Sequence, residues 1–374
     1  MSNPAPAGDS PSAKIFFEDR NYRVAGPRCR WYPRCRLPWA IHATIFVQRA
    51  TVKTARSIPS PSKPLAPDHL PAVNASMGLA EWLLLGVLSM LWGGSFFFIG
   101  VAVHEVTPFT LVFCRVGLAA VILLGMCFMT GRRLPADLGL WSAFLVMGAL
   151  NNLIPFSLIA WSQQHIQSSL ASILNATTPI FSVVLAHFLT GEERLTANRG
   201  IGVLLGWLGV LLLIGIESLA GFDLQIAGYL AVLGAAVCYA AAAIFGRRFR
   251  DLHPVTVTTG MLCCSSVMLV PLALIFEQPF ALHPSAAAWA AILGLSLVST
   301  AAAYMIYFRI LARAGATNIL LVTFLIPVSA ILLGVLILGE RLGWNALGGM
   351  LLIFAGLIAI DGRLLKKWAS GHRR

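Results

Sequence analysis

The stretch LTGEERLTANRGIG, residues 189–202, sets a charged turn between two apolar runs, and LILGERLGWNALGG, residues 336–349, repeats the arrangement. Each stretch contains a Gly-Glu step, an Arg-Leu step and later glycines at nearly the same spacing. Charges are costly inside hydrocarbon, so a charged turn between long apolar runs is typical of a chain that leaves a membrane and re-enters it. The two stretches predict both membrane insertion and an internal repeat.

Composition supports membrane insertion. Hydrophobic residues make up 58% of the 374 residues and charged residues only 11%, whereas a soluble domain has roughly a quarter charged residues. The apolar runs do not alternate with period two, which favours helices over a barrel. We therefore expect an all-α integral membrane protein with ten transmembrane helices, at 80–102, 108–130, 138–161, 168–190, 199–217, 226–246, 255–276, 287–308, 317–338 and 344–361.

The distribution of Lys and Arg predicts the orientation, because these residues are retained on the cytoplasmic side. With ten spans, one side has only Arg341. The other side collects Arg132, Arg133, Arg194, Arg199, Arg247, Arg248, Arg250, Arg309, Arg313, Arg363, Lys366, Lys367, Arg373 and Arg374. We expect a multi-pass protein of the inner (plasma) membrane with both termini in the cytoplasm. The net charge of +12 then reflects topology, and we expect no nucleic-acid partner.

The segments outside the spans differ in composition from the rest. Residues 1–76 are basic, rich in Pro and Ser, and have no apolar run long enough to cross a membrane, so we expect a largely disordered N-terminal extension. Met77 opens directly into the first span, and whether it or Met1 is the start stays open. Residues 363–374 form a basic tail that we expect in the cytoplasm.

An internal repeat divides the membrane part into residues 77–217 and 225–362. At an offset of 147 or 148 residues the second part reproduces eight residues of the first, namely Trp141, Pro179, Gly191, Glu192, Arg194, Asn198, Gly202 and Gly209. Each repeat contains five spans, an odd number, so we expect the two five-helix repeats to be inserted with inverted topology. Both Gly-Glu turns then lie at water interfaces, on opposite sides; a gating role for Glu192 or Glu340 stays open.

Polar residues at membrane depth predict a binding cavity, because they need partners or a water-filled space. They include Asn151, Ser157 and Gln163 of the third span, Thr177 and Thr178 of the fourth, Tyr307 of the eighth and Thr323 of the ninth. Proline can free a backbone carbonyl that a ligand could use. The residues that we expect to bind substrate are Trp92, Ser95, Arg115, Asn152, Phe156, Trp161, Asn175, Pro179, Tyr239, Thr300, Tyr304 and Pro327.

Arg115 is the charged residue expected well inside a span, and we expect no carboxylate beside it. It either anchors the helix through backbone carbonyls or binds a substrate carboxylate; both interpretations stay open. The repeat offset aligns it with Met261 or Leu262, so it has no counterpart in the second half.

Three features together resemble a known family: Trp-Gly-Gly-Ser at 92–95, the stretch from Pro108 to Arg115, and the twice-occurring Pro…Gly-Glu-x-(x)-Arg-Leu pattern. Over about residues 78–362 the chain resembles EamA-type members of the drug/metabolite transporter superfamily. The resemblance implies a metabolite transporter, often an exporter of amino acids or related compounds.

The residues favour the same class. No phosphate-binding Gly-x-x-x-x-Gly-Lys occurs, and HEVTP at 104–108 lacks the second His of a zinc protease. We expect a secondary transporter that moves small metabolites by alternating access, with no cofactor and no metal, rather than a polytopic membrane enzyme or a channel-like protein. The expected partners are a small metabolite and the lipid bilayer; a homodimer stays open, as does coupling to protons.

Overall fold

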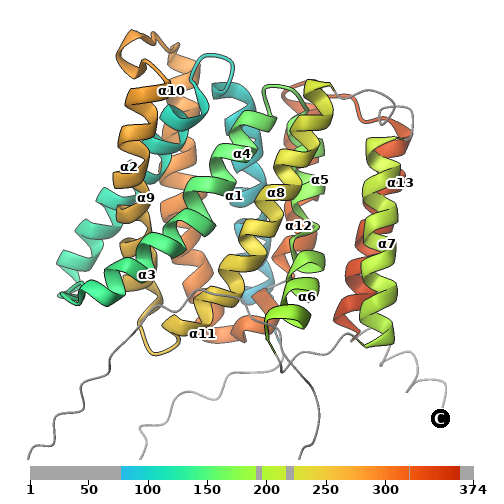
Figure 1. Cartoon of the computed structure of the whole chain (residues 1–374), viewed down its shortest axis with the longest axis horizontal. Coiled ribbons are helices and arrows are strands. Elements are labelled where there is room, and N and C mark those ends of the chain that lie inside the picture. The colour runs from blue at the N-terminus through green and yellow to red at the C-terminus, as the bar shows by residue number, and fades with distance from the viewer. Residues whose placement is uncertain (1–76, 191–195, 216–222, 320, 363–374) are drawn as a thin grey trace, which may run out of the picture. The chain divides into compact units, whose positions relative to one another are not determined.

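The computed structural model describes residues 77–190, 196–215, 223–319 and 321–362, and within these ranges every regular element is a helix (Figure 1). Nine helical segments in this part of the chain are long and apolar enough to cross a membrane. The N-terminal extension, the Gly-Glu-Glu-Arg-Leu turn at 191–195 and the basic tail lie outside the described residues.

The helices begin where the sequence supplies capping residues. The segments of the first half are α1 (Leu79–Ala102), α2 (Pro108–Met129), α3 (Leu138–Gly148), η1 (Ala149–Leu153), α4 (Ile154–Ser162), α5 (Ser168–Asn175), α6 (Thr178–Leu189) and α7 (Ala197–Ile214). Asp137 accepts a hydrogen bond from the Leu140 amide at the start of α3. Pro108 occupies the first turn of α2, where its missing amide hydrogen costs nothing.

The second half contains α8 (Leu224–Phe245), η3 (Gly246–Phe249), α9 (Pro254–Phe276), η4 (Pro279–Ala281), α10 (Ala286–Leu293), η5 (Gly294–Ala302), α11 (Ala303–Ile319), α12 (Val322–Leu336) and α13 (Trp344–Asp361). Asp223 caps α8 and Ser285 caps α10 through backbone amides. Proline again occupies the first turn of α9.

The ninth expected span differs most from its prediction. The expected helix at 317–338 is observed as α12, which has only 15 residues. Residues up to Ile319 belong to α11, which is kinked at Gly315. Gly315 has a φ of +79°, which non-glycine residues rarely adopt, so the backbone turns there. A glycine near a span end thus shifts a boundary that hydropathy alone does not fix.

Three of the expected spans are interrupted within their length. The third and eighth expected spans each contain a π-helical segment, η1 and η5. The fourth is split into α5 and α6 around Ala176 and Thr177. Such wider or broken turns expose backbone and side chains that a regular helix would cover, and they are frequent at functional sites.

Glycines bring α7 and α13 into close contact, and the two helices lie side by side in Figure 1. A Cβ atom added to Gly202 would lie 2.5 Å from the Gly356 carbonyl oxygen, and one added to Gly209 would lie 2.7 Å from the Gly349 carbonyl oxygen. Small residues at this spacing let helix backbones approach closely inside a membrane.

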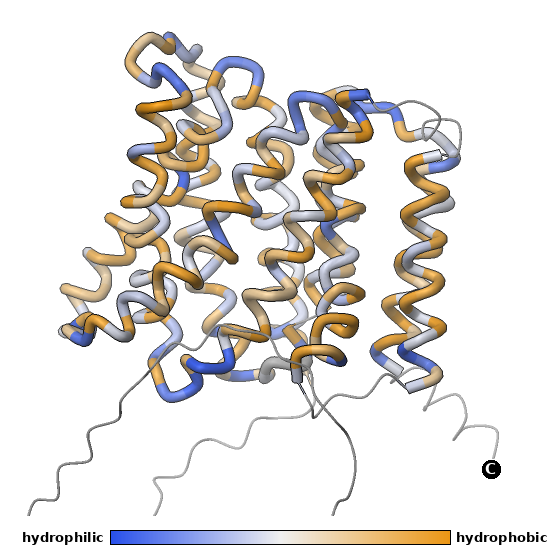
Figure 2. The backbone as a smooth tube through the Cα atoms, in the orientation of Figure 1, coloured by the Kyte–Doolittle hydropathy of each residue, from blue (hydrophilic) through white to orange (hydrophobic). Residues whose placement is uncertain are grey.

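The outward surfaces of the helices remain apolar. Phe128 is 88% exposed and Leu204 is 65% exposed, whereas a soluble protein covers most such side chains. Figure 2 shows apolar residues along the helices and hydrophilic residues concentrated in the connections at their two ends. This arrangement is that of a multi-pass membrane protein whose outer surface contacts lipid.

Candidate functional site

A cavity of about 580 Å³ lies between the helices of the two halves, within the range of about 300–1,000 Å³ that holds small ligands in proteins. Its walls come from α1, α2, α3, η1, α4, α5, α6, α8, η3, α9, η5, α11 and α12. The interrupted segments therefore contribute directly to the lining.

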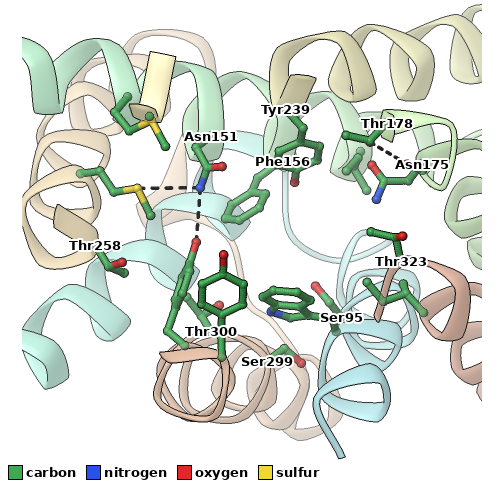
Figure 3. Close-up of a pocket in the computed structure, with 18 of the residues that line it drawn as sticks. Ser95, Asn151, Phe156, Asn175, Thr178, Tyr239, Thr258, Ser299, Thr300 and Thr323 are labelled. Atoms are coloured by element: carbon green, nitrogen blue, oxygen red, sulfur yellow. Dashed lines mark hydrogen bonds between the residues drawn. The ribbon is translucent and has the colours of Figure 1, made fainter. Parts of the chain in front are cut away.

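Nine of the twelve residues expected to bind substrate line this cavity. They are Trp92, Ser95, Arg115, Phe156, Asn175, Tyr239, Thr300, Tyr304 and Pro327. Figure 3 shows several of them converging from different helices. Residues up to 235 positions apart in sequence, as Trp92 and Pro327 are, thus share one site.

Arg115 is buried, with 6% of its surface exposed, and lies in the cavity wall. Its Nε donates a hydrogen bond of 3.0 Å to the Thr300 hydroxyl, and its Cζ lies 3.7 Å from the centre of the Phe156 ring. A cation over an aromatic face is attracted by the ring quadrupole. Among the described residues no acidic side chain lines the cavity or pairs with Arg115.

Asn151, rather than its neighbour, presents an amide to the cavity. Its Nδ2 lies 3.3 Å from the Tyr304 hydroxyl and 3.8 Å from the Met261 sulfur (Figure 3). Asn152 is fully buried and donates through Nδ2 to the Ser265 hydroxyl at 3.1 Å. The expectation that Asn152 lines the cavity is wrong, because the π-helical turn η1 presents Asn151 to the lumen and Asn152 to α9.

Trp161 and Pro179 also lie outside the lining. The Trp161 ring packs edge-on against His165, with 4.8 Å between ring centres. Pro179 follows the break between α5 and α6, and the Asn175 carbonyl that it would leave free accepts a 2.7 Å hydrogen bond from the Thr178 hydroxyl. The expectation of an unused carbonyl is therefore wrong at this position. The side chains around the break, Asn175 and Thr178, line the cavity instead.

Aromatic rings form much of the remaining wall. Trp92 lies 5.7 Å from Tyr307, and Tyr304 stacks on Phe308 at 6.0 Å between ring centres. Tyr307, named above among the polar residues that predict the cavity, and Phe308, which was not predicted, line the cavity with them. The spacing of Phe308 from Tyr304 along α11, one turn, is the sequence signal that could have identified it.

Two buried polar atoms in the lining lack a hydrogen-bond partner among the described residues: the Ser299 hydroxyl and the Asn175 Oδ1. A buried polar atom without a partner costs free energy, about 1–3 kcal/mol. Both atoms are covered by neighbouring atoms in this conformation, although their residues belong to the cavity wall.

The lining extends to one end of the helix assembly. It includes Gly246, Phe249, Arg250, Leu252 and Pro254 of the α8–α9 connection. Described residues of the connections at the other end, such as 103–107 and 277–285, are not in the lining. The cavity thus approaches the surface at the end that carries most arginines.

Three carboxylates bridge the two halves at the other end. Each accepts hydrogen bonds from the start of a helix in the opposite half. Glu340 accepts from the Ser168 amide and hydroxyl, both at 2.7 Å, and from the amide and hydroxyl of Ser169. Glu277 accepts from the amides of Phe109 and Thr110, at 2.9 and 2.8 Å. An anion at a helix N-terminus is stabilised by its free amides.

The third bridge joins Glu105 to the start of α10. The Ser285 amide and hydroxyl donate to its carboxylate at 2.6 and 2.8 Å. These hydrogen bonds, first the backbone one and then the hydroxyl one, hold the pKa of Glu105 below its ordinary value of 4.5. We call Glu105, Glu277 and Glu340 the three bridging carboxylates.

Comparison with known proteins gives two matches of one family model. The model described as "EamA-like transporter family" matches residues 80–215 and, again, residues 226–360. Together these segments cover more than half of the chain.

Individual relatives are similar over most of their length. "Uncharacterized transporter YoaV" of Bacillus subtilis (strain 168) is 27% identical over 279 residues, which is 74% of this chain and 95% of the relative. "Probable amino-acid metabolite efflux pump" of Escherichia coli (strain K12) is 27% identical over 291 residues, 73% of this chain and 93% of the relative. "Uncharacterized inner membrane transporter YedA" of the same strain is 26% identical over 294 residues, covering 75% and 90%.

A solved crystal structure has the same fold, with a TM-score of 0.56 at 20% sequence identity. The alignment covers 76% of this chain and 98% of that chain.

Proposed function

Because the chain belongs to the EamA-like transporter family, we propose that it is a secondary carrier that moves a small metabolite across the membrane by alternating access. The observation that carries the proposal is a ligand-sized cavity that reaches one end of the helices, while the opposite end is held closed by bridges between the halves. A carrier needs this asymmetry, since its site faces one side at a time.

The pattern of helix contacts supports two halves with inverted topology and ten spans. Helix α2 packs on α9, and α7 packs on α13, so each of these pairs joins corresponding spans of the halves. The contact of α1 with α12 has its counterpart in α8 with α6, and that of α4 with α8 has its counterpart in α11 with α1. An exchange of the halves leaves this contact pattern unchanged, as an inverted repeat requires.

The three bridging carboxylates support a gate at the closed end. Each joins an acidic residue of one half to a helix start of the other, so the halves cannot separate there without breaking these hydrogen bonds. Opening this end and closing the arginine-rich end would convert one access state to the other. Glu340, whose gating role was left open above, is one of these residues.

The charge pattern and the relatives support a direction of transport and a side of the membrane for the cavity. With arginines cytoplasmic, the cavity faces the cytoplasm and the bridging carboxylates face outward. A cavity that fills from the cytoplasm suits export, and one relative is named as an amino-acid metabolite efflux pump. We infer efflux from the cytoplasm across the inner membrane, with both termini on the cytoplasmic side.

The alternative functions fit the geometry less well. A channel needs a path open at both ends, whereas bridges between the halves join the connections opposite the cavity mouth. A hydrolytic or redox enzyme needs acidic, activated nucleophilic or metal-ligating groups in its cavity. The described lining consists of aromatic, amide, hydroxyl and arginine side chains together with apolar ones.

Flux measurements test the proposal. The purified chain is reconstituted into vesicles loaded with a panel of labelled metabolites, and release is followed with and without unlabelled metabolite outside. A carrier gives saturable release that external substrate accelerates, and repeating the assay with a collapsed proton gradient reports on coupling. Non-saturable leakage of all panel members would indicate a channel, and release of none would reject the carrier function.

A further inference from the structure

We propose that Arg115 binds the carboxylate of the substrate, so that the substrate class is a small organic monoanion with a flat apolar body. This inference rests on the proposed carrier function, because it assigns the ligand of the same cavity. It assigns a binding role to one residue for which the sequence left two interpretations open.

The first argument is the charge of Arg115. Placing a guanidinium inside a membrane protein costs free energy unless the charge is compensated. The described partners are one hydroxyl, that of Thr300, and one ring face, that of Phe156. Both are neutral, so the net positive charge remains uncompensated among the described residues. An anionic ligand would supply the missing charge.

The second argument is the geometry of the donors. A guanidinium carries five N–H groups arranged to hold a carboxylate with two parallel hydrogen bonds. Only Nε donates a described hydrogen bond. The terminal nitrogens are not among the side-chain atoms that are sealed off without a partner, so they are accessible from the cavity whose wall Arg115 forms. Arg115 as a helix anchor would instead direct these groups to backbone carbonyls.

The charge balance of the whole lining favours an anion over a cation or a zwitterion. The charged residues in the described lining are Arg115, on α2, and Arg250, in the α8–α9 connection. A substrate ammonium would meet no carboxylate there and would be repelled by both arginines.

The walls define the rest of the ligand. Phe156 and Tyr239 lie 6.4 Å apart between ring centres, and Trp92, Tyr304 and Tyr307 line the same space. Aromatic walls favour flat or apolar groups, which they contact with little loss of side-chain entropy. A carboxylate attached to an aromatic or branched carbon body matches both the cation and the walls.

Binding of matched ligand sets to the full chain in lipid nanodiscs tests the inference. The probes are 3-phenylpropanoate, indole-3-acetate and 4-methyl-2-oxopentanoate, each beside its uncharged amide, with 3-phenylpropylamine and phenylalanine as a cation and a zwitterion. Equilibrium dialysis of labelled ligand measures Kd. We expect at least one acid to bind about tenfold or more tightly than its amide, and more tightly than the amine and the amino acid.

Substitution of the arginine gives a second, independent readout. Arg115→Met should weaken binding of the acid about tenfold or more and leave binding of its amide within twofold, so that the preference disappears. Arg115→Lys keeps the positive charge but lacks the planar array of N–H donors, so it should retain part of the preference for the acid over its amide. The matched control is Arg313→Met, an exposed arginine outside the cavity, which should bind like the parent.

The outcomes separate this inference from the proposed function. Equal binding of acids and amides by the parent chain, tighter binding of the amine or amino acid, or binding of none of the three acids would each overturn the role of Arg115, even if Arg115→Met does not fold. Saturable flux of neutral or cationic compounds alone would leave the carrier function standing and reject the anion. Absence of all flux would instead reject the carrier function.

Discussion

Asn151 and Asn152 are adjacent in sequence and lie in different environments. One amide contacts the Tyr304 hydroxyl in the cavity wall, and the other is buried against Ser265 of α9. Their substitutions should therefore affect different properties, which makes the pair a sensitive test of the site.

We expect Asn151→Leu to reduce substrate affinity roughly tenfold with little change in thermal stability, because it removes one hydrogen bond to a ligand or to Tyr304. Asn152→Leu should instead destabilise the fold by about 1–3 kcal/mol, because it leaves the buried Ser265 hydroxyl without this donor. Thermal unfolding in detergent and ligand binding measure the two effects. A reversed pattern would show that the π-helical turn has been placed in the wrong register.

Sequence reasoning predicted nine of the residues that line the cavity, among them Arg115 and Tyr239, but not every residue that faces it. That these residues bind substrate stays a prediction. The error at Asn152 has a physical cause: a π turn adds a residue to the helix, and a helical period of 3.6 then assigns the wrong side chain to the lumen. The prediction of a free carbonyl at Asn175 was wrong because the Thr178 hydroxyl donates a hydrogen bond to it, and hydropathy does not predict such a bond.

The helix ends carry the contacts that we assign to the gate. Glu340→Gln should weaken the closed end, because an amide accepts through one oxygen only and cannot satisfy the donors of both Ser168 and Ser169. A cysteine at Ile99, inside the cavity, should then react several-fold faster with an impermeant reagent added from the Glu340 side. The matched control is Glu81→Gln, whose carboxylate binds the Gly78 amide of its own helix. Unchanged labelling would exclude Glu340 from the gate.

The pH dependence of the same end follows from Glu105. Its pKa is lowered by the Ser285 hydrogen bonds, so the carboxylate form is favoured while the bridge is intact. The bridge contributes fully above the ordinary value of 4.5 and is lost as the pH falls through the lowered pKa. Because only the thiolate reacts, labelling at the Ile99 cysteine is compared with labelling of a cysteine at the exposed Asn345 at the same pH. The ratio should stay low between pH 8 and about 5 and rise only at lower pH. An increase near neutrality would contradict a lowered pKa.

The contact of α7 with α13 gives a separate test of helix packing. Gly356→Ala would place a Cβ 2.5 Å from the Gly202 carbonyl oxygen, which is backbone and cannot move aside, so we expect destabilisation of about 1–3 kcal/mol. In Gly125→Ala, also in a helix, the new Cβ has nothing within 4 Å and should be neutral or slightly stabilising. Thermal unfolding of both variants checks the difference, and equal stability would show that the two helices are not in contact.

Element positions were more predictable than element continuity. Long apolar runs predict where helices lie, since each must satisfy its own backbone in lipid. They do not predict the break between α5 and α6 or the turn at Gly315, because these depend on backbone conformations that helices from the other half stabilise. Glu105 and Glu277 were not predicted, and the partners of Glu340 were not predicted either, because each bridge joins residues more than 160 positions apart.

At the scale of the whole molecule, the decisive question is which ends of the helices face which side of the membrane. Asn198, at the start of α7, and Asn345, at the start of α13, are both exposed and occupy corresponding positions in the two halves. In a background with the other cysteines replaced, Asn345→Cys should react with an impermeant thiol reagent added outside, and Asn198→Cys only after the membrane is permeabilised. Two equivalent positions on opposite sides require an odd number of crossings between them, so this result supports inverted halves. Labelling of both from the same side would reject inversion, and with it the assignment of the bridging carboxylates to the outward end.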